Sequence, residues 1–185
     1  MDNIVSLYTT STGRVSRKTW WLGMIGLLVA SIVLSIILSV IGLGPWGAMQ
    51  ALDPAAADPA AVSAALAATM RSAAWGSLII FVLLAYPIYC LSLKRRQDRD
   101  NSGFDVKVYL VLMLVLTLVQ ALGFGMTVTD MGSGVIVPVP APWLMILSGI
   151  LGIFGIYLLV VLGFLAGTVG DNSYGADPLL VPETA

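Results

Sequence analysis

The chain has 185 residues, of which 58% are hydrophobic and only 10% are charged, and its formal net charge is −1. Soluble domains have about 45–50% apolar and about 25% charged residues, so this composition excludes a soluble globular protein and predicts an integral membrane protein. The absence of histidine removes the commonest general base and the commonest metal ligand. Because Cys90 is the single cysteine, no disulfide can form within the chain.

Four hydrophobic segments follow one another, at about residues 20–43, 75–93, 106–128 and 143–169. Each is near the roughly 20 residues that an α-helix needs to cross about 30 Å of hydrocarbon. Backbone polar groups inside lipid must find partners within the protein, so these segments are predicted to be helices. The expected fold is all-α: a four-helix transmembrane bundle that forms a single membrane domain over residues 1–185, with a cytoplasmic tail at 170–185.

The basic residues are distributed unevenly around these segments. Arg71 is the only one in the first and third connecting loops, whereas the other eight lie before the first segment or around the middle loop. These eight are Arg14, Arg17, Lys18, Lys94, Arg95, Arg96, Arg99 and Lys107. Lys and Arg favour cytoplasmic loops, so both termini of this multi-pass protein are predicted to be cytoplasmic.

The first and third loops give different predictions. In the first, Asp58-Pro59 is typical of a helix start, since aspartate caps helices and proline fits the first helical position. Val62, Leu66 and Met70 then recur every four residues. A short periplasmic helix is therefore expected from about Pro59, either separate from the second span or continuous with it, and a flexible Ala/Pro-rich linker is the alternative. The third loop is rich in glycine and proline and is expected to be extended and irregular.

Small residues recur along two of the spans and predict helix-packing faces, because they let helices approach closely. These residues are Ser31, Ser35, Ser39, Gly152, Gly163 and Gly167. Such faces would serve packing within the bundle or contact with a partner or a second copy. No charged residue lies in the middle of any span, which argues against an ion-coupled pathway, and Gln120 is the strongest polar group at depth.

Three polar motifs lie on the side predicted to be cytoplasmic. Their sequences are GRVSRKTWW at 13–21, KRRQDRDNSGF at 94–104 and GDNSYGADP at 170–178. At these residues the chain resembles the DUF805 family, small bacterial inner-membrane proteins of unknown function. The matching residues are Gly13, Arg14, Arg17 and Trp20 or Trp21, then Arg95, Arg96, Asp98 or Asp100, Ser102 and Gly103, then Asn172, Tyr174, Gly175, Asp177 and Pro178. The middle motif departs from the family at Gln97, in the region where family members usually carry a Leu-His pair, and the resemblance implies no reaction.

The motif residues are predicted to form a cytoplasmic polar cap. Its members are Arg14, Arg17, Arg95, Arg96, Asp98, Asn172, Tyr174 and Asp177. Arginine binds carboxylates through two parallel hydrogen bonds, so basic residues of the first two motifs are predicted to pair with Asp171 and Asp177 and to hold the tail across the bundle. Arg95 and Asp98 are also spaced for a local ion pair. The other readings are a topology-setting helix–turn–helix connection and a site for anionic lipid headgroups.

No P-loop, GxSxG, HExxH or CxxC pattern occurs in the sequence. We therefore predict no enzymatic activity, no catalytic, metal or cofactor site and no nucleic-acid partner. The predicted function is an accessory, scaffold or regulatory subunit that binds membrane proteins, itself or lipid. One alternative is a small-solute transporter or channel, which a polar cavity at Tyr86, Pro87 and Gln120 would favour. A second alternative is a lipid-modifying enzyme, which a metal held by Asp98 and Asp171 would favour.

Overall fold

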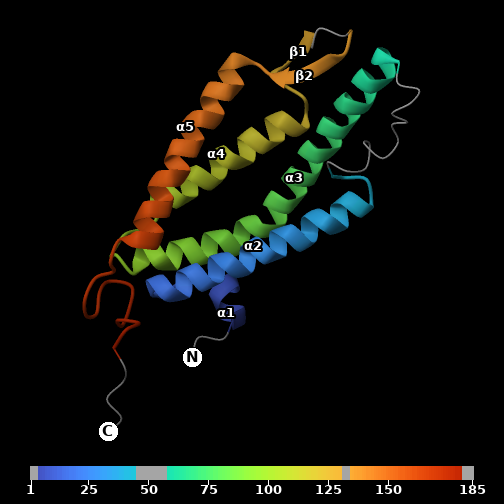
Figure 1. The fold of residues 1–185 in the computed structure, drawn as a ribbon. Coiled ribbons are helices and arrows are strands. Elements are labelled where there is room, and N and C mark those ends of the chain that lie inside the picture. Colours follow the sequence, from blue (N-terminus) through green and yellow to red (C-terminus); the bar gives the residue numbers. More distant parts are fainter. Residues whose placement is uncertain (1–3, 45–57, 131–133, 181–185) are drawn as a thin grey trace. The chain divides into compact units, whose positions relative to one another are not determined.

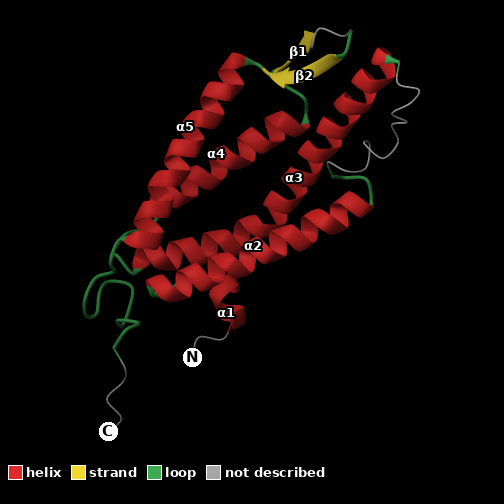
Figure 2. Cartoon of the chain, viewed as in Figure 1, coloured by secondary structure: helices red, strands yellow, loops and turns green. Residues whose placement is uncertain are grey.

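The computed structural model describes residues 4–44, 58–130 and 134–180. The elements, in chain order, are α1 (Ile4–Thr9), α2 (Arg17–Val40), α3 (Pro59–Gln97), α4 (Phe104–Ala121), β1 (Met126–Asp130), β2 (Ile136–Pro140), α5 (Pro142–Leu159) and one π-helical turn, η2 (Val160–Phe164) (Figure 1). The protein is mostly helical, and a two-stranded hairpin, yellow in Figure 2, joins α4 to α5.

The four predicted spans are confirmed as long apolar helices, although three of them end early. α2 ends at Val40, three residues before the predicted limit of the first span. By length and composition α2, α3, α4 and the segment Pro142–Phe164 could each cross a membrane. However, α4 stops at Ala121 instead of reaching residue 128, and glycines with positive φ follow it at Gly123 and Gly125, a usual way of ending a helix. Similarly, helical structure ends at Phe164, five residues before the predicted limit of the fourth span.

The helix predicted from Pro59 exists, but it is not a separate short helix. α3 runs without interruption for 39 residues, from the first loop through the second span. The Asp58 carboxylate accepts the N–H of Ala60 at 3.4 Å, as expected for a capping aspartate. Residues 45–57, which form the rest of the alanine-rich loop, lie outside the described residues.

The third loop is not irregular, so the prediction of an all-α fold was wrong at this point. β1 and β2 pair antiparallel, with Val128 opposite Pro138 and Met126 opposite Pro140. β-Branched residues dominate both strands, and they favour a pleated conformation. Pro138 and Pro140 are two residues apart, so the positions that lack an N–H share one edge of the strand and the ladder is not interrupted.

The chain forms two compact units, and each long helix contributes a segment to both. The first unit comprises Met1–Ala30, Leu84–Leu112 and Leu151–Ala185, and it contains all three polar motifs. Its apolar core is formed by Leu7, Val15, Trp20, Leu27, Leu91, Val106, Leu158 and Leu162. The second unit comprises Ser31–Leu83 and Met113–Ile150 and contains the hairpin. Here the N–H of Ile136 donates to the Ser63 hydroxyl at 2.8 Å and ties β2 to α3.

The small residues predicted to form packing faces have different surroundings. Ser31, Ser35 and Ser39 are half-buried on α2. A Cβ added to Gly152 would meet nothing within 4 Å, whereas one added to Gly163 would lie 2.8 Å from the Trp21 ring.

Gly167 lies beyond the last helical residue, and an added Cβ would lie 2.0 Å from the Asp98 carboxylate. Gly163 and Gly167 therefore do not form a helical GxxxG face. They leave room for Trp21 and Asp98, respectively.

The close approach of Gly125 to Trp143 gives the first testable prediction. A Cβ at Gly125 would lie 2.3 Å from the Trp143 ring, whereas one at Gly123 would meet nothing within 4 Å. Both glycines have positive φ, so Gly123→Ala should cost about 1–2 kcal/mol, and Gly125→Ala should cost about 1–3 kcal/mol more. Thermal unfolding of the detergent-solubilised variants measures the difference. Equal unfolding temperatures would show that the ring moves aside without cost.

Candidate functional site

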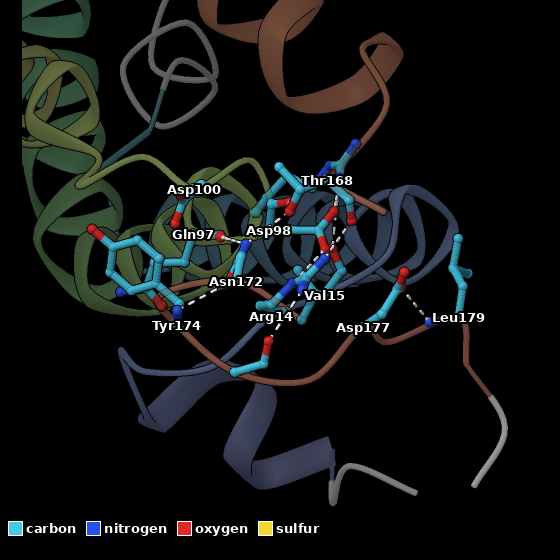
Figure 3. Close-up of polar contacts among 12 residues, drawn as sticks. Arg14, Val15, Gln97, Asp98, Asp100, Thr168, Asn172, Tyr174, Asp177 and Leu179 are labelled. Atoms are coloured by element: carbon cyan, nitrogen blue, oxygen red, sulfur yellow. Dashed lines mark hydrogen bonds and ion pairs between the residues drawn. The ribbon is translucent and has the colours of Figure 1, made fainter. Parts of the chain in front are cut away.

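Three buried charged side chains form the centre of the polar motifs. The side chains of Arg14 and Arg95 are 1% exposed, and that of Asp98 is 5% exposed. Asp98 accepts Arg14 Nε at Oδ1, at 3.1 Å (Figure 3). Its Oδ2 accepts Arg95 Nη1. The predicted ion pair between Arg95 and Asp98 is confirmed. Asp98, and not Asp100, is thus the motif carboxylate that bridges the two arginines.

Arg14 joins this carboxylate to the C-terminal tail through backbone carbonyls. Its Nη1 donates to the carbonyls of Gly170 at 2.6 Å and Gly175 at 3.1 Å. Its Nη2 donates to the carbonyl of Thr168 at 2.7 Å. A guanidinium presents five N–H donors in a fixed plane, so one side chain can hold three points of the tail and a carboxylate at once.

The last carbonyls of the α5–η2 segment are held by side chains from the first two motifs. The carbonyls at a helix C-terminus have no partner within the helix and carry its negative dipole, which favours cationic donors. Five consecutive carbonyls accept side-chain donors here: Val161 from Arg99 at 3.4 Å, Leu162 from Arg95 at 2.8 Å, Gly163 from the Trp21 indole at 3.1 Å, Phe164 from Arg17 at 3.2 Å and Leu165 from Arg95 at 2.5 Å. The basic residues thus stabilise the helix end from which the tail begins.

The tail itself folds back onto the end of α3. Thr168 donates its N–H at 2.8 Å and its hydroxyl at 3.0 Å to the carbonyl of Asp98. The Asn172 amide donates to the carbonyl of Gln97 at 2.9 Å, as Figure 3 shows. The Ser173 N–H donates to the Asp100 carboxylate at 3.2 Å. The structure thus brings residues of the second and third motifs together, and most of these contacts involve backbone groups.

The carboxylates of the tail do not pair with the arginines, so this part of the prediction was wrong. Asp177 accepts the N–H groups of Leu179 and Gly170, each at 2.9 Å, and Asp171 accepts the N–H of Asp177 at 3.4 Å. Within residues 4–44, 58–130 and 134–180, neither carboxylate lies in an ion pair. The hydrogen bonds from Leu179 and Gly170 lower the pKa of Asp177, and the positive charge of Arg14 lowers it further.

Two of the predicted cap residues have other roles. Arg96 forms a bidentate ion pair with Asp105 in the first turn of α4, with Nη2–Oδ2 at 2.9 Å and Nε–Oδ1 at 3.1 Å. The Tyr157 hydroxyl also donates to this carboxylate at 3.3 Å. Tyr174 takes part through its backbone N–H, which donates to the Asn172 side chain at 2.9 Å.

Sequence reasoning left several contacting residues out of the cap: Trp21, Lys94, Arg99, Asp105 and Thr168. Lys94 contacts the N-terminal helix α1, because its ammonium donates to the carbonyl of Ser6 at 2.5 Å. Thr168 carried no recognisable signal, because its part in the cap depends on the path of the tail backbone. Arg99 could have been found from its position in the middle motif.

This arrangement fixes the tail in place and gives internal partners to the polar groups of Asp98 and Arg14. Both oxygens of Asp98 accept from arginines, and Arg14 donates to the tail at three further points. Within the part of the chain that the structure describes, no group of three His, Cys, Asp or Glu residues could hold a metal ion. The site is therefore best described as a buried electrostatic fastener, and we call Arg14, Arg95 and Asp98 the fastener triad.

The four apolar helices define a multi-pass membrane protein. The family described as "Protein of unknown function (DUF805)" matches residues 8–176, and the chain belongs to this family. The match covers the fastener triad and the tail as far as residue 176. Comparisons with curated proteins and with solved structures give no match.

Loss of Arg14 should release the tail. Arg14→Gln removes the guanidinium contacts with the tail and leaves Asp98 with one cationic partner. Chymotryptic cleavage after Tyr174 should therefore rise at least about tenfold, which corresponds to about 1.4 kcal/mol of lost docking free energy. Arg14→Lys keeps the charge and loses the planar guanidinium, so its cleavage rate should lie between those of the parent protein and Arg14→Gln.

The matched control for this experiment is Lys18→Gln. Lys18 is exposed in the same motif, and it makes no ion pair or hydrogen bond among the described residues. Its replacement should leave the cleavage rate unchanged. Mass spectrometry of the products measures the cleavage. Equal cleavage of Arg14→Gln and the parent protein would contradict the proposed role of Arg14 in holding the tail.

The lowered pKa of Asp177 predicts how the docked tail responds to pH. A carboxyl whose pKa is lower when docked stabilises the docked tail fully above its ordinary pKa of about 3.9 and loses this contribution as the pH falls through the docked value. A spin label at Ala176→Cys, with Cys90 buried and unreactive, should thus stay immobile from pH 7 to pH 5 and gain mobility in stronger acid. In Asp177→Asn the mobility at pH 7 should already be raised. A label released between pH 7 and pH 5 would be inconsistent with this assignment.

Proposed function

We propose that the protein is a non-enzymatic accessory or scaffold protein of the bacterial inner membrane, which binds other membrane proteins or a second copy of itself. The observation that carries this proposal is the use of the motif side chains. Arg14, Arg95 and Asp98 all make internal contacts, with one another, with the end of η2 and with the tail. A site used in this way stabilises one conformation of the protein and offers no free acid, base or nucleophile to a substrate.

The apolar surface of α2 supports the binding of partners in the membrane. In the most apolar 18-residue stretch of α2, only 11% is buried within the protein, whereas the corresponding share in the other three spans is 17–28%. Exposed side chains of α2 within the first unit include Leu22, Ile25, Leu28 and Val29. Lipid or a helix of another protein would cover such a surface.

Anionic lipid is a second partner that the charges support. Arg17, Lys18 and Lys107 are exposed in the first unit, at the ends of predicted spans. Each basic residue near an acidic leaflet contributes about 1 kcal/mol of attraction. With the termini in the cytoplasm, as the basic residues predict, these side chains would face the inner leaflet.

The alternatives receive less support. A transporter would be favoured by a polar cavity at Tyr86, Pro87 and Gln120. The cavity that Gln120 lines has mostly apolar walls, and neither Tyr86 nor Pro87 is among its lining residues in the described part of the chain. A lipid-modifying enzyme would need Asp98 as a metal ligand, but its two oxygens accept from Arg14 and Arg95.

Crosslinking in intact membranes, followed by gentle extraction of the full-length protein, tests the proposal. We expect a stoichiometric membrane partner or a second copy, crosslinked through an exposed position of α2 such as Ile25. A photoreactive residue at Val106, which is buried in the first unit, is the matched control and should give no such product. A monomer that crosslinks only to lipid from every exposed position of α2 would overturn the proposal.

A further inference from the structure

The second unit contains a cavity that the polar motifs do not explain. Its volume is about 580 Å³, which lies within the roughly 300–1,000 Å³ of typical ligand sites. α3 contributes one wall from Ala67 to Ala74, and the end of α4, the hairpin and the start of α5 contribute the others. All lining residues belong to this one unit.

The walls are mainly apolar, and their positions are fixed by hydrogen bonds. Alanines of α3 leave the space open, while Met126, Pro138 and Leu144 supply larger apolar surfaces. The hairpin that carries two of these residues is tied to α3 by the bond from Ile136 to Ser63. At its other end the N–H of Ala141 donates to the carbonyl of Gly125 at 2.7 Å. The cavity therefore has a defined wall opposite α3.

Two polar side chains line this cavity, and both are available to a ligand. Arg71 is the only Lys or Arg in this unit, and it is exposed. Among the described residues its guanidinium makes no ion pair or hydrogen bond, and the side-chain amide of Gln120 makes none either. An unpaired guanidinium is a forked donor suited to a phosphate or carboxylate group.

We propose that this cavity binds one anionic phospholipid from the bilayer, with an acyl chain along the apolar walls and its phosphate on Arg71. The apolar walls match hydrocarbon, and the single uncompensated cation matches a negatively charged headgroup. The Gln120 amide can donate to an ester carbonyl between the two. The residues of this site are separate from the fastener triad. The lipid site therefore does not depend on the function proposed above, and each proposal can be tested by itself.

Photolabelling of the full-length protein tests this assignment. The probe is a phosphatidylglycerol with a diazirine in its acyl chain, in vesicles of phosphatidylcholine. Labelled peptides should come from residues 67–74, 120–126 and 138–144. Arg71→Gln should lower the yield at these peptides about fivefold, and Arg71→Lys should retain most of it. Ala74→Phe, which fills the cavity and keeps the charge, should also lower the yield.

Two controls make the result decisive. Lys107→Gln removes an exposed charge from the other unit and should leave labelling of the three peptides unchanged. Arg14→Gln, which releases the tail, should also leave it unchanged, so failure of one proposal is distinguishable from failure of the other. Label spread evenly over all exposed apolar helix surfaces would overturn the site. Equal labelling by a phosphatidylcholine probe, together with an unchanged yield in Arg71→Gln, would overturn the anionic headgroup.

Discussion

The buried Asp98 carboxylate is the interaction on which the first unit depends. Two arginines from separate parts of the chain reach it, one before α2 and one near the end of α3. Isolated charges are very costly to bury, so each of the three is tolerable only because the others are present. The arginines then use their remaining donors on the end of η2 and on the tail. One carboxylate thus places three separate chain segments together.

The charges of the triad do not sum to zero, and backbone carbonyl groups stabilise the remaining positive charge. The triad contains two positive charges and one negative charge. The remaining positive charge faces the carbonyl groups at the end of the α5–η2 segment and in the tail. The carbonyls at the helix end carry the negative end of the helix dipole. The local electrostatics therefore depend on how the tail backbone is folded, and not only on which acidic residues the sequence contains.

Sequence reasoning found the features that side chains or apolar runs encode directly. The four apolar helices, the Asp58 cap and the pair of Arg95 with Asp98 all follow from composition or spacing. The tail contacts did not follow, because every residue has a carbonyl and no sequence pattern says which carbonyl an arginine will reach. Tail carboxylates were chosen as partners because they are visible in the sequence. The hairpin was missed because Gly and Pro outweighed the β-branched residues at 127–129, 135–137 and 139. Prolines spaced by two are nevertheless compatible with an edge strand.

The uninterrupted length of α3 has a consequence at the membrane surface. At 1.5 Å per residue, its 39 residues span about 58 Å of helix, whereas a bilayer with its headgroups is about 40–45 Å thick. At the average tilt of about 20°, such a helix still spans about 55 Å along the bilayer normal, so part of it is expected to extend beyond the headgroups. Its first turns are rich in alanine and carry Ser63, the hairpin's hydrogen-bond partner, which is compatible with a solvated extension. The N-terminal turns of α3, which precede the cavity lined by Ala67 to Ala74, would thus lie outside the lipid.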